Sequence, residues 1–162
     1  MSRFLAFLAL ALTLAGCASE VRQGATTASA RPATELAVMQ SRLMASSPQL
    51  TLRAAVAALH DLGYRFTHID PRGAVSAIKE NRLLVSVLVV PTGTGLVAVR
   101  ANALMRSNLG PDFTQVDLLE FYQRGIFDPL AAMAGVPAQP IAPGQPLPEL
   151  FRPIERAPSP LP

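Results

Sequence analysis

The sequence predicts an α+β fold: a two-layer sandwich in which an antiparallel sheet of about four to five strands packs against two helices on one face. Two segments have apolar residues at helical spacing, and they flank a central region rich in β-branched residues and turn signals. This patterning falls within residues 35–135. We therefore expect one globular domain there, built in the order strand, helix, four strands, helix, without internal repeats.

The first segment of this domain, residues 35–45, fits two patterns. Leu36, Met39 and Leu43 have helical spacing. The competing pattern is an edge strand with alternating residues Leu36, Val38, Gln40, Arg42 and Met44. We favour the strand.

The next segment is the clearest helix. Ser47 followed by Pro48 is typical of an N-cap and a first helical residue, and Gly63 provides a C-terminal stop. Between them the apolar residues recur at helical spacing, at Leu52, Ala55, Val56, Leu59 and Leu62.

Four strands are predicted after this helix. Residues 64–70 alternate as a strand, turn at Pro71-Arg72-Gly73, and continue in a second strand over 74–79. Residues 83–90 and 96–105 are the two longest β-rich segments, and the turn cluster Pro91-Thr92-Gly93-Thr94-Gly95 joins them.

Residues 112–127 are predicted to form the second helix, from the spacing of Val116, Leu119, Tyr122 and Ile126. Pro129 forbids a smooth continuation because it lacks an amide proton and clashes with the preceding turn. Asp128-Pro129 should therefore start a new short turn that ends at Gly135.

The only cysteine of the chain lies directly behind a short apolar segment. Arg3 supplies a positive charge, and residues 4–14 have the length of the apolar part of a signal peptide, too short to span a bilayer. Leu14-Ala15-Gly16-Cys17 resembles the lipobox of bacterial lipoproteins. That resemblance implies a signal peptide over residues 1–16, cleavage between Gly16 and Cys17, and diacylglycerol and N-acyl lipid on Cys17. The alternative is an ordinary secretory signal with a chance cysteine.

Lipidation also predicts a location. A single acyl chain binds membranes marginally, whereas two or three chains on one residue hold a protein firmly. In Gram-negative lipoproteins an aspartate after the cysteine typically retains the protein in the inner membrane, and this chain has Ala18 there. The resemblance therefore implies the periplasmic face of the outer membrane, with the inner membrane as the alternative.

The composition of the remaining chain narrows its function. Removing residues 1–16 takes the basic count from 14 to 13 against 11 acidic residues, a net charge of about +2. This is too small to indicate nucleic-acid binding, and no second cysteine exists for a disulfide. Residues 17–34 predict a flexible tether. Residues 136–162, with nine prolines, predict a disordered tail excluded from any regular ladder.

Four short motifs carry a resemblance to a known group. They are Arg53-Ala-Ala-Val-Ala-Ala-Leu-His-Asp-Leu-Gly-Tyr64, Gly73-Ala-Val-Ser-Ala-Ile-Lys79, Val99-Arg-Ala-Asn102 and Glu120-Phe-Tyr-Gln-Arg124. Residues 39–130 thereby resemble small bacterial lipoproteins, of proteobacterial type, whose domain is similar to TATA-binding-protein-like and outer-membrane-assembly-lipoprotein-C-like folds. None of the motifs is catalytic, so the resemblance implies fold and envelope location only.

The catalytic and metal-binding motifs in the chain are weak. Ser76-Ala-Ile-Lys79 matches the Ser-x-x-Lys of penicillin-binding proteins, but on a strand these two side chains point to opposite faces. His68 and Asp70 share a strand face, yet they form a metal site only if His60 lies nearby. The sequence therefore predicts no catalytic site, no metal and no cofactor beyond the lipid on Cys17, and we expect a protein that is not an enzyme.

Residues 83–90 point to a contact surface. They are apolar on both faces of the strand except at Ser86, whereas a strand with one solvated face should alternate. The N-terminal segment or neighbouring side chains would cover the face away from the helices; the alternatives are a partner protein, a second copy or the proline-rich tail. Arg100 and Asn102 share one face and would rim this surface. The candidate partner-binding residues are Leu84, Leu88, Val90, Arg100 and Asn102.

Together these observations predict a lipid-anchored, non-enzymatic binding or accessory module of an envelope complex. The alternative function is a periplasmic carrier or sensor of a small apolar ligand held between sheet and helices.

Overall fold

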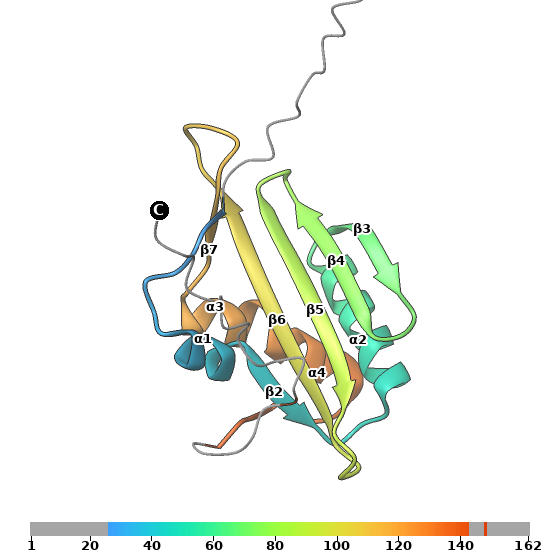
Figure 1. The fold of residues 1–162 in the computed structure, drawn as a ribbon. Coiled ribbons are helices and arrows are strands. Elements are labelled where there is room, and N and C mark those ends of the chain that lie inside the picture. Colours follow the sequence, from blue (N-terminus) through green and yellow to red (C-terminus); the bar gives the residue numbers. More distant parts are fainter. Residues whose placement is uncertain (1–25, 143–147, 149–162) are drawn as a thin grey trace, which may run out of the picture.

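An eight-stranded sheet forms the centre of the protein (Figure 1). The computed structural model describes residues 26–142 and residue 148. The strands are β1 Thr26–Thr27, β2 Ser41–Met44, β3 Arg65–Asp70, β4 Ala74–Lys79, β5 Leu83–Pro91, β6 Val97–Arg106, β7 Phe113–Gln115 and β8 Gln139–Pro140. The predicted mixture of helices and sheet is confirmed, and the strand pairs are antiparallel except for β1 and β7, which pair in parallel. The sheet has more strands than the four to five predicted. β1, β7 and β8 could not be predicted, because strands of two or three residues are too short to show any periodicity.

The helical elements are α1 Ala33–Met39, α2 Pro48–Asp61, α3 Leu119–Tyr122, the π-helical segment η1 Gln123–Phe127, and α4 Asp128–Ala134. The helix α2 begins as predicted, because the Ser47 side chain accepts a hydrogen bond from the Leu50 amide at 3.2 Å. It ends where Gly63 adopts a positive φ of 81°. Within the part of the chain that the structure describes, no helix has the length and hydropathy needed to cross a bilayer.

Three predictions need correction. The preference for a strand over 35–45 is wrong for its first half, which is α1, and right for Ser41–Met44, because this part pairs with β6. The predicted helix over 112–127 begins too early, because Phe113–Gln115 pairs with the end of β6 before α3 starts. The predicted break at Asp128-Pro129 is wrong, because the backbone stays helical from α3 through the π-helical segment η1 into α4. The predicted end at Gly135, in the left-handed conformation, is confirmed.

The core lies between one sheet face and the helices α2 and α4. The inward-facing residues of β4, β5 and β6 are buried valines and alanines, and Leu59 of α2 is only 2% exposed against them. Tyr122, Ile126, Phe127 and Leu130 add the C-terminal helical segment to the same core. Because one face of the sheet packs against α2 and α4, the side chains of the opposite face point away from the helices.

The long strand β6 has a different neighbour along each half of one edge. β3, β4, β5 and β6 pair in order and antiparallel. On its other edge, β6 pairs with β2 along Val97–Arg100 and with β7 along Leu104–Arg106. β8 then pairs antiparallel with β2, and β1 pairs parallel with β7. Segments from both ends of the described chain therefore complete the sheet.

The predicted tether and tail both extend into the described residues. Residues 26–34, assigned to the tether, include β1 and the start of α1. In the proline-rich segment, Gln139 and Pro140 pair with β2, so the exclusion of this segment from every ladder is wrong there. Gln139 keeps its amide proton, and both residues sit at a sheet edge where proline is tolerated. The predicted signal peptide, Cys17, the rest of the tether to residue 25, and residues 143–147 and 149–162 lie outside the described residues.

Candidate functional site

The sheet face opposite α2 and α4, here called the outer face, carries all the predicted partner-binding residues. The strand register arranges its side chains in four cross-strand rows: Ile78, Leu84 and Leu104; Ser76, Ser86 and Asn102; Ala74, Leu88 and Arg100; and Val90, Ala98 and Leu43. Each of the five predicted residues is half-buried. Arg100 and Asn102 do share this face, as predicted from their spacing.

A hydrogen-bonded cluster fixes the polar part of the outer face. Arg100 donates from Nη2 to Oε1 of Gln40 at 3.2 Å, and Gln40 donates from Nε2 to Oδ1 of Asn102 at 3.3 Å. Gln115 donates to the same Asn102 oxygen at 3.0 Å. Desolvation lowers the pKa of Arg100 from its ordinary value, but an arginine remains charged at neutral pH. The outer face therefore presents a positive group whose orientation is set by its neighbours.

Tyr122 supports this cluster from the interior. Between β2 and β7, the hydroxyl of this fully buried residue accepts hydrogen bonds from the Ala103 amide at 3.2 Å and from Gln40 Nε2 at 2.9 Å. It donates to the Val116 carbonyl at 2.8 Å. Desolvation raises the pKa of Tyr122, while the hydrogen bonds from Gln40 and Ala103 act in the opposite direction. On this edge of β6, neither β2 nor β7 pairs with residues 101–103. The neutral phenol of Tyr122 provides hydrogen bonds in this gap, where a strand neighbour would otherwise provide them.

Sequence reasoning missed both Gln40 and Tyr122 as site residues. The sequence pattern places Gln40 in a segment that fits either a helix or a strand, and it places Tyr122 in a helical stripe. The available signal was chemical, because a tyrosine in an apolar stripe must find partners for its hydroxyl when it is buried.

Ile141 covers one end of the outer face. It is 4% exposed and packs with Leu43 and Ala98, and Leu88 and Val90 lie against the same cluster. The chain reaches this position because β8 runs along the edge of β2. The sequence analysis left open what covers the face away from the helices. At this end of the outer face, the first residues of the proline-rich segment cover it.

Replacing Ile141 with alanine should lower the free energy of unfolding by about 2 kcal/mol, the lower end of the usual range because the cluster is small and can relax. Ile69→Ala is the matched control, since Ile69 is 48% exposed. Chemical denaturation of both variants measures the difference. Equal losses in the two variants would mean that Ile141 does not hold the segment to the face.

A concave surface lies at the edge of the domain. It is a hollow of about 270 Å³ lined by Val38, Met39, Arg42, Leu119, Gln123, Phe127, Asp128, Ala138 and Pro140. The guanidinium of Arg42 stacks over the Phe127 ring, 4.7 Å from its centroid, and donates from Nη1 to the Ser41 carbonyl at 2.8 Å. Desolvation lowers the pKa of Arg42, and Asp128 opposes that effect. The sequence did not reveal this hollow because η1 and β8 complete it.

The weak catalytic and metal motifs are not assembled into sites in the described residues. Ser76 lies 2.9 Å from Ser86 on the outer face, measured between the hydroxyl oxygens, whereas Lys79 Nζ lies 5.8 Å from the Tyr64 ring centroid. Asp70 binds Arg72 in a bidentate ion pair, which lowers the pKa of the Asp70 carboxyl to about 2. No group of three or more metal-ligating side chains occurs among residues 26–142 and 148.

One space between the sheet and the helices bears on the proposed apolar ligand. The space bounded by α2, β5, Ile126 and Leu130 has no room for a water-sized sphere. An apolar ligand could enter it only if these elements separated.

No protein-family model, curated protein or solved structure matches this chain. The resemblance to small bacterial lipoproteins therefore remains a prediction from the four motifs. The roles of the outer-face residues rest on their contacts, burial and charge.

Proposed function

We propose that this chain is a periplasmic lipoprotein, anchored by lipid on Cys17 to the outer membrane, that binds another envelope protein and performs no catalysis. The alternative location is the periplasmic face of the inner membrane. The lipobox supports the anchor, because the only cysteine of the chain falls at the cleavage point behind a short apolar segment. The finer fold class, a two-layer sandwich with two helices on one face, belongs to the same proposal. Such a fold leaves one sheet face for a partner.

The observation that carries the binding role is the composition of the outer face beyond Ile141. The row of Ile78, Leu84 and Leu104 crosses three strands, and each of these side chains keeps part of its surface exposed. Arg100 and Asn102 lie beside the apolar residues. Interfaces combine apolar contacts with arginine in this way. The expected partner is a protein with an apolar patch next to a carboxylate that can pair with Arg100.

Pre-organisation supports the same role. Gln40 holds Arg100 and Asn102 in place through hydrogen bonds, so less side-chain entropy is lost when a partner contacts them. The carrier alternative has no comparable support, because the space between α2, β5, Ile126 and Leu130 has no room for a water-sized sphere.

Site-specific crosslinking in native membranes tests the binding role. A photoreactive residue at Leu84 should give one adduct of defined mass, and mass spectrometry should identify a protein rather than lipid in it. Adding Ser86→Arg to the same chain should abolish the adduct, because the new charged side chain projects from the centre of the outer face.

Gln49→Arg is the matched control, since Gln49 is an exposed residue of α2 on the other side of the sheet. The adduct should persist in that variant. Circular dichroism must show that both variants are folded. If the adduct survives Ser86→Arg in a folded chain, or if none forms at Leu84, the outer face is not the binding surface.

A further inference from the structure

We infer that the end of the sheet formed by the β4–β5 turn and the β6–β7 loop contacts the lipid bilayer, with Leu109 as the inserting residue. This inference rests on the proposed lipid anchor at Cys17. We call this region, residues 79–82 and 105–112, the membrane-facing end.

The strand register puts these two connections at one end of the molecule. Leu83 at the start of β5 pairs with Met105, Arg106 pairs with Phe113, and Phe113 pairs in turn with Thr26 of β1. The Arg106 amide donates to the Arg82 carbonyl at 2.7 Å, which joins the turn and the loop. The first described residue therefore enters the fold at the membrane-facing end (Figure 1).

Leu109 is the most exposed large apolar residue of the described chain. It is 98% exposed at the tip of the β6–β7 loop, and Met105 beside it is 38% exposed. A single exposed leucine is ordinary on a protein surface. Here it projects from a loop at the end where the chain leads back to Cys17, and a leucine at such a tip can enter the boundary between headgroups and acyl chains.

Positive side chains lie along this end of the sheet. The membrane-facing end contains Lys79, Arg82 and Arg106. On β3, the strand next to β4, Arg65 donates a hydrogen bond from Nη2 to Asn81 at 2.7 Å. Arg82 also hydrogen-bonds Asn108 in the loop. Glu80 and Asp112 are the acidic residues in the same region. The membrane-facing end thus carries three basic groups against two acidic ones, and Arg65 beside it adds a fourth positive charge, a balance that favours contact with anionic headgroups.

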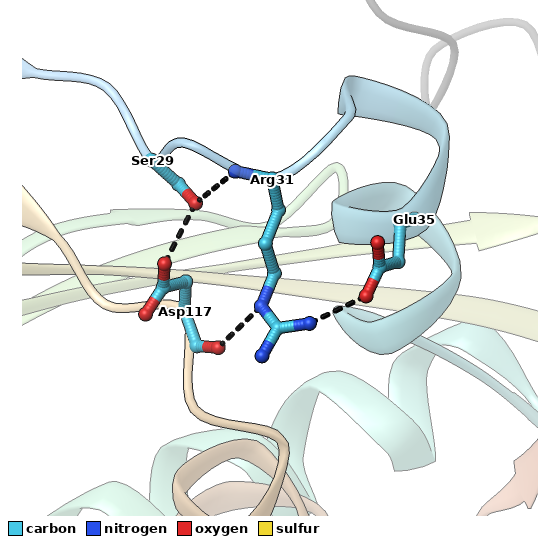
Figure 2. Close-up of polar contacts among 4 residues, drawn as sticks. All are labelled: Ser29, Arg31, Glu35 and Asp117. Atoms are coloured by element: carbon cyan, nitrogen blue, oxygen red, sulfur yellow. Dashed lines mark hydrogen bonds and ion pairs between the residues drawn. The ribbon is translucent and has the colours of Figure 1, made fainter.

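A polar clasp fixes the N-terminal segment to the domain just after β1. Ser29 donates from Oγ to Oδ2 of Asp117 at 2.8 Å, and Arg31 donates from Nε to the Asp117 carbonyl at 3.1 Å (Figure 2). Arg31 also forms an ion pair with Glu35 of α1. Because of this clasp and the pairing of β1, the span between anchor and domain starts at Thr26 and not at residue 35.

The remaining span is short. Eight residues, 18–25, separate Cys17 from Thr26, and nine peptide steps reach at most about 30 Å even when fully extended. The ten-residue strand β6 is itself about 33 Å long at the usual rise per residue. The membrane-facing end therefore stays within about 30 Å of the bilayer, whereas the β5–β6 loop lies at the far end of β6.

Tryptophan fluorescence tests this contact, because the chain contains no tryptophan. The full lipidated chain carrying Leu109→Trp is reconstituted into vesicles of phosphatidylethanolamine and phosphatidylglycerol, with and without acyl-brominated lipid. Thr94→Trp is the matched control, since Thr94 is exposed in the β5–β6 loop. The Leu109→Trp emission should shift to shorter wavelength and be quenched by brominated lipid, and the Thr94→Trp emission should do neither.

Flotation of the same samples separates the two proposals. If the protein floats with the vesicles and Leu109→Trp behaves like Thr94→Trp, the bilayer contact is wrong and the anchor stands. If the protein does not float, the anchor fails, and the contact that rests on it fails as well. Flotation with quenching only at position 109 supports both.

Discussion

Cys17→Ser is expected to release the protein from the membrane. Serine cannot form the diacylglyceryl thioether, so the variant loses every acyl chain that the lipobox predicts. Each buried methylene contributes about 0.8 kcal/mol to membrane binding, and losing two or three chains removes nearly all of it. The variant should lose labelling by fatty acid, and it should appear soluble in the periplasm or stay unprocessed.

Ala18→Ser is the matched control for this experiment. It introduces the same side chain one position later and leaves the cysteine in place, so labelling and membrane fractionation should be retained. If Cys17→Ser fractionates with membranes as fully as the parent chain, the lipobox interpretation is wrong. The contact at the membrane-facing end alone is too weak to hold the protein there.

Tyr122→Phe is expected to destabilise the domain strongly although it removes a single oxygen. The change leaves the buried Ala103 amide and the half-buried Val116 carbonyl without this partner and takes one acceptor from Gln40. Each buried polar group left unsatisfied costs about 1 to 3 kcal/mol, so we expect a loss of about 2 to 4 kcal/mol in the free energy of unfolding. Urea denaturation at neutral pH measures it.

Tyr64→Phe serves as the control. Tyr64 is also buried, and its hydroxyl has no hydrogen bond within the part of the chain that the structure describes, so its removal should change stability little. Equal losses in the two variants would show that the Tyr122 hydrogen bonds do not support the sheet.

The pH dependence gives a second readout for Tyr122. Burial raises its pKa above the ordinary value of 10.0, so the stabilisation is fully present below pH 10.0 and is lost as the pH rises towards the pKa of the folded state. The difference in stability between the parent chain and Tyr122→Phe should therefore shrink above pH 10.0. Tyr64 is present in both proteins, so its own raised pKa cancels in the comparison.

The elements that could be predicted from the sequence are those with a pattern of their own. The helix α2 has a cap, an apolar stripe and a glycine stop. The strands β3 to β6 form consecutive hairpins, and clear turn residues mark the first and the last of the three connections. The outer face could be predicted because residues 83–90 are apolar on both sides of one strand. Each of these signals is local.

The features that could not be predicted depend on contacts between distant segments. β7 is a strand because β6 offers it a free edge, and no periodicity in three residues reveals that. The role of Gln40 in orienting Arg100 follows from the gap between β2 and β7. Ile141 is buried because β8 carries it along the edge of β2, in a segment whose prolines indicated only a tail.

The pairing of β8 with β2 also bears on how the chain folds. The hairpins from β3 to β6 join neighbours in sequence, whereas Leu43 pairs with Gln139 across most of the described chain. Closing so long a loop costs chain entropy that local hairpins avoid, so contacts of this kind form slowly. We expect the hairpins from β3 to β6 to form first. The segments at both ends of the described chain should pair along the edge of β6 last. The segment that closes the sheet is then the one that opens most readily, and its opening would uncover Leu88 and Val90 on the outer face while the core stays intact.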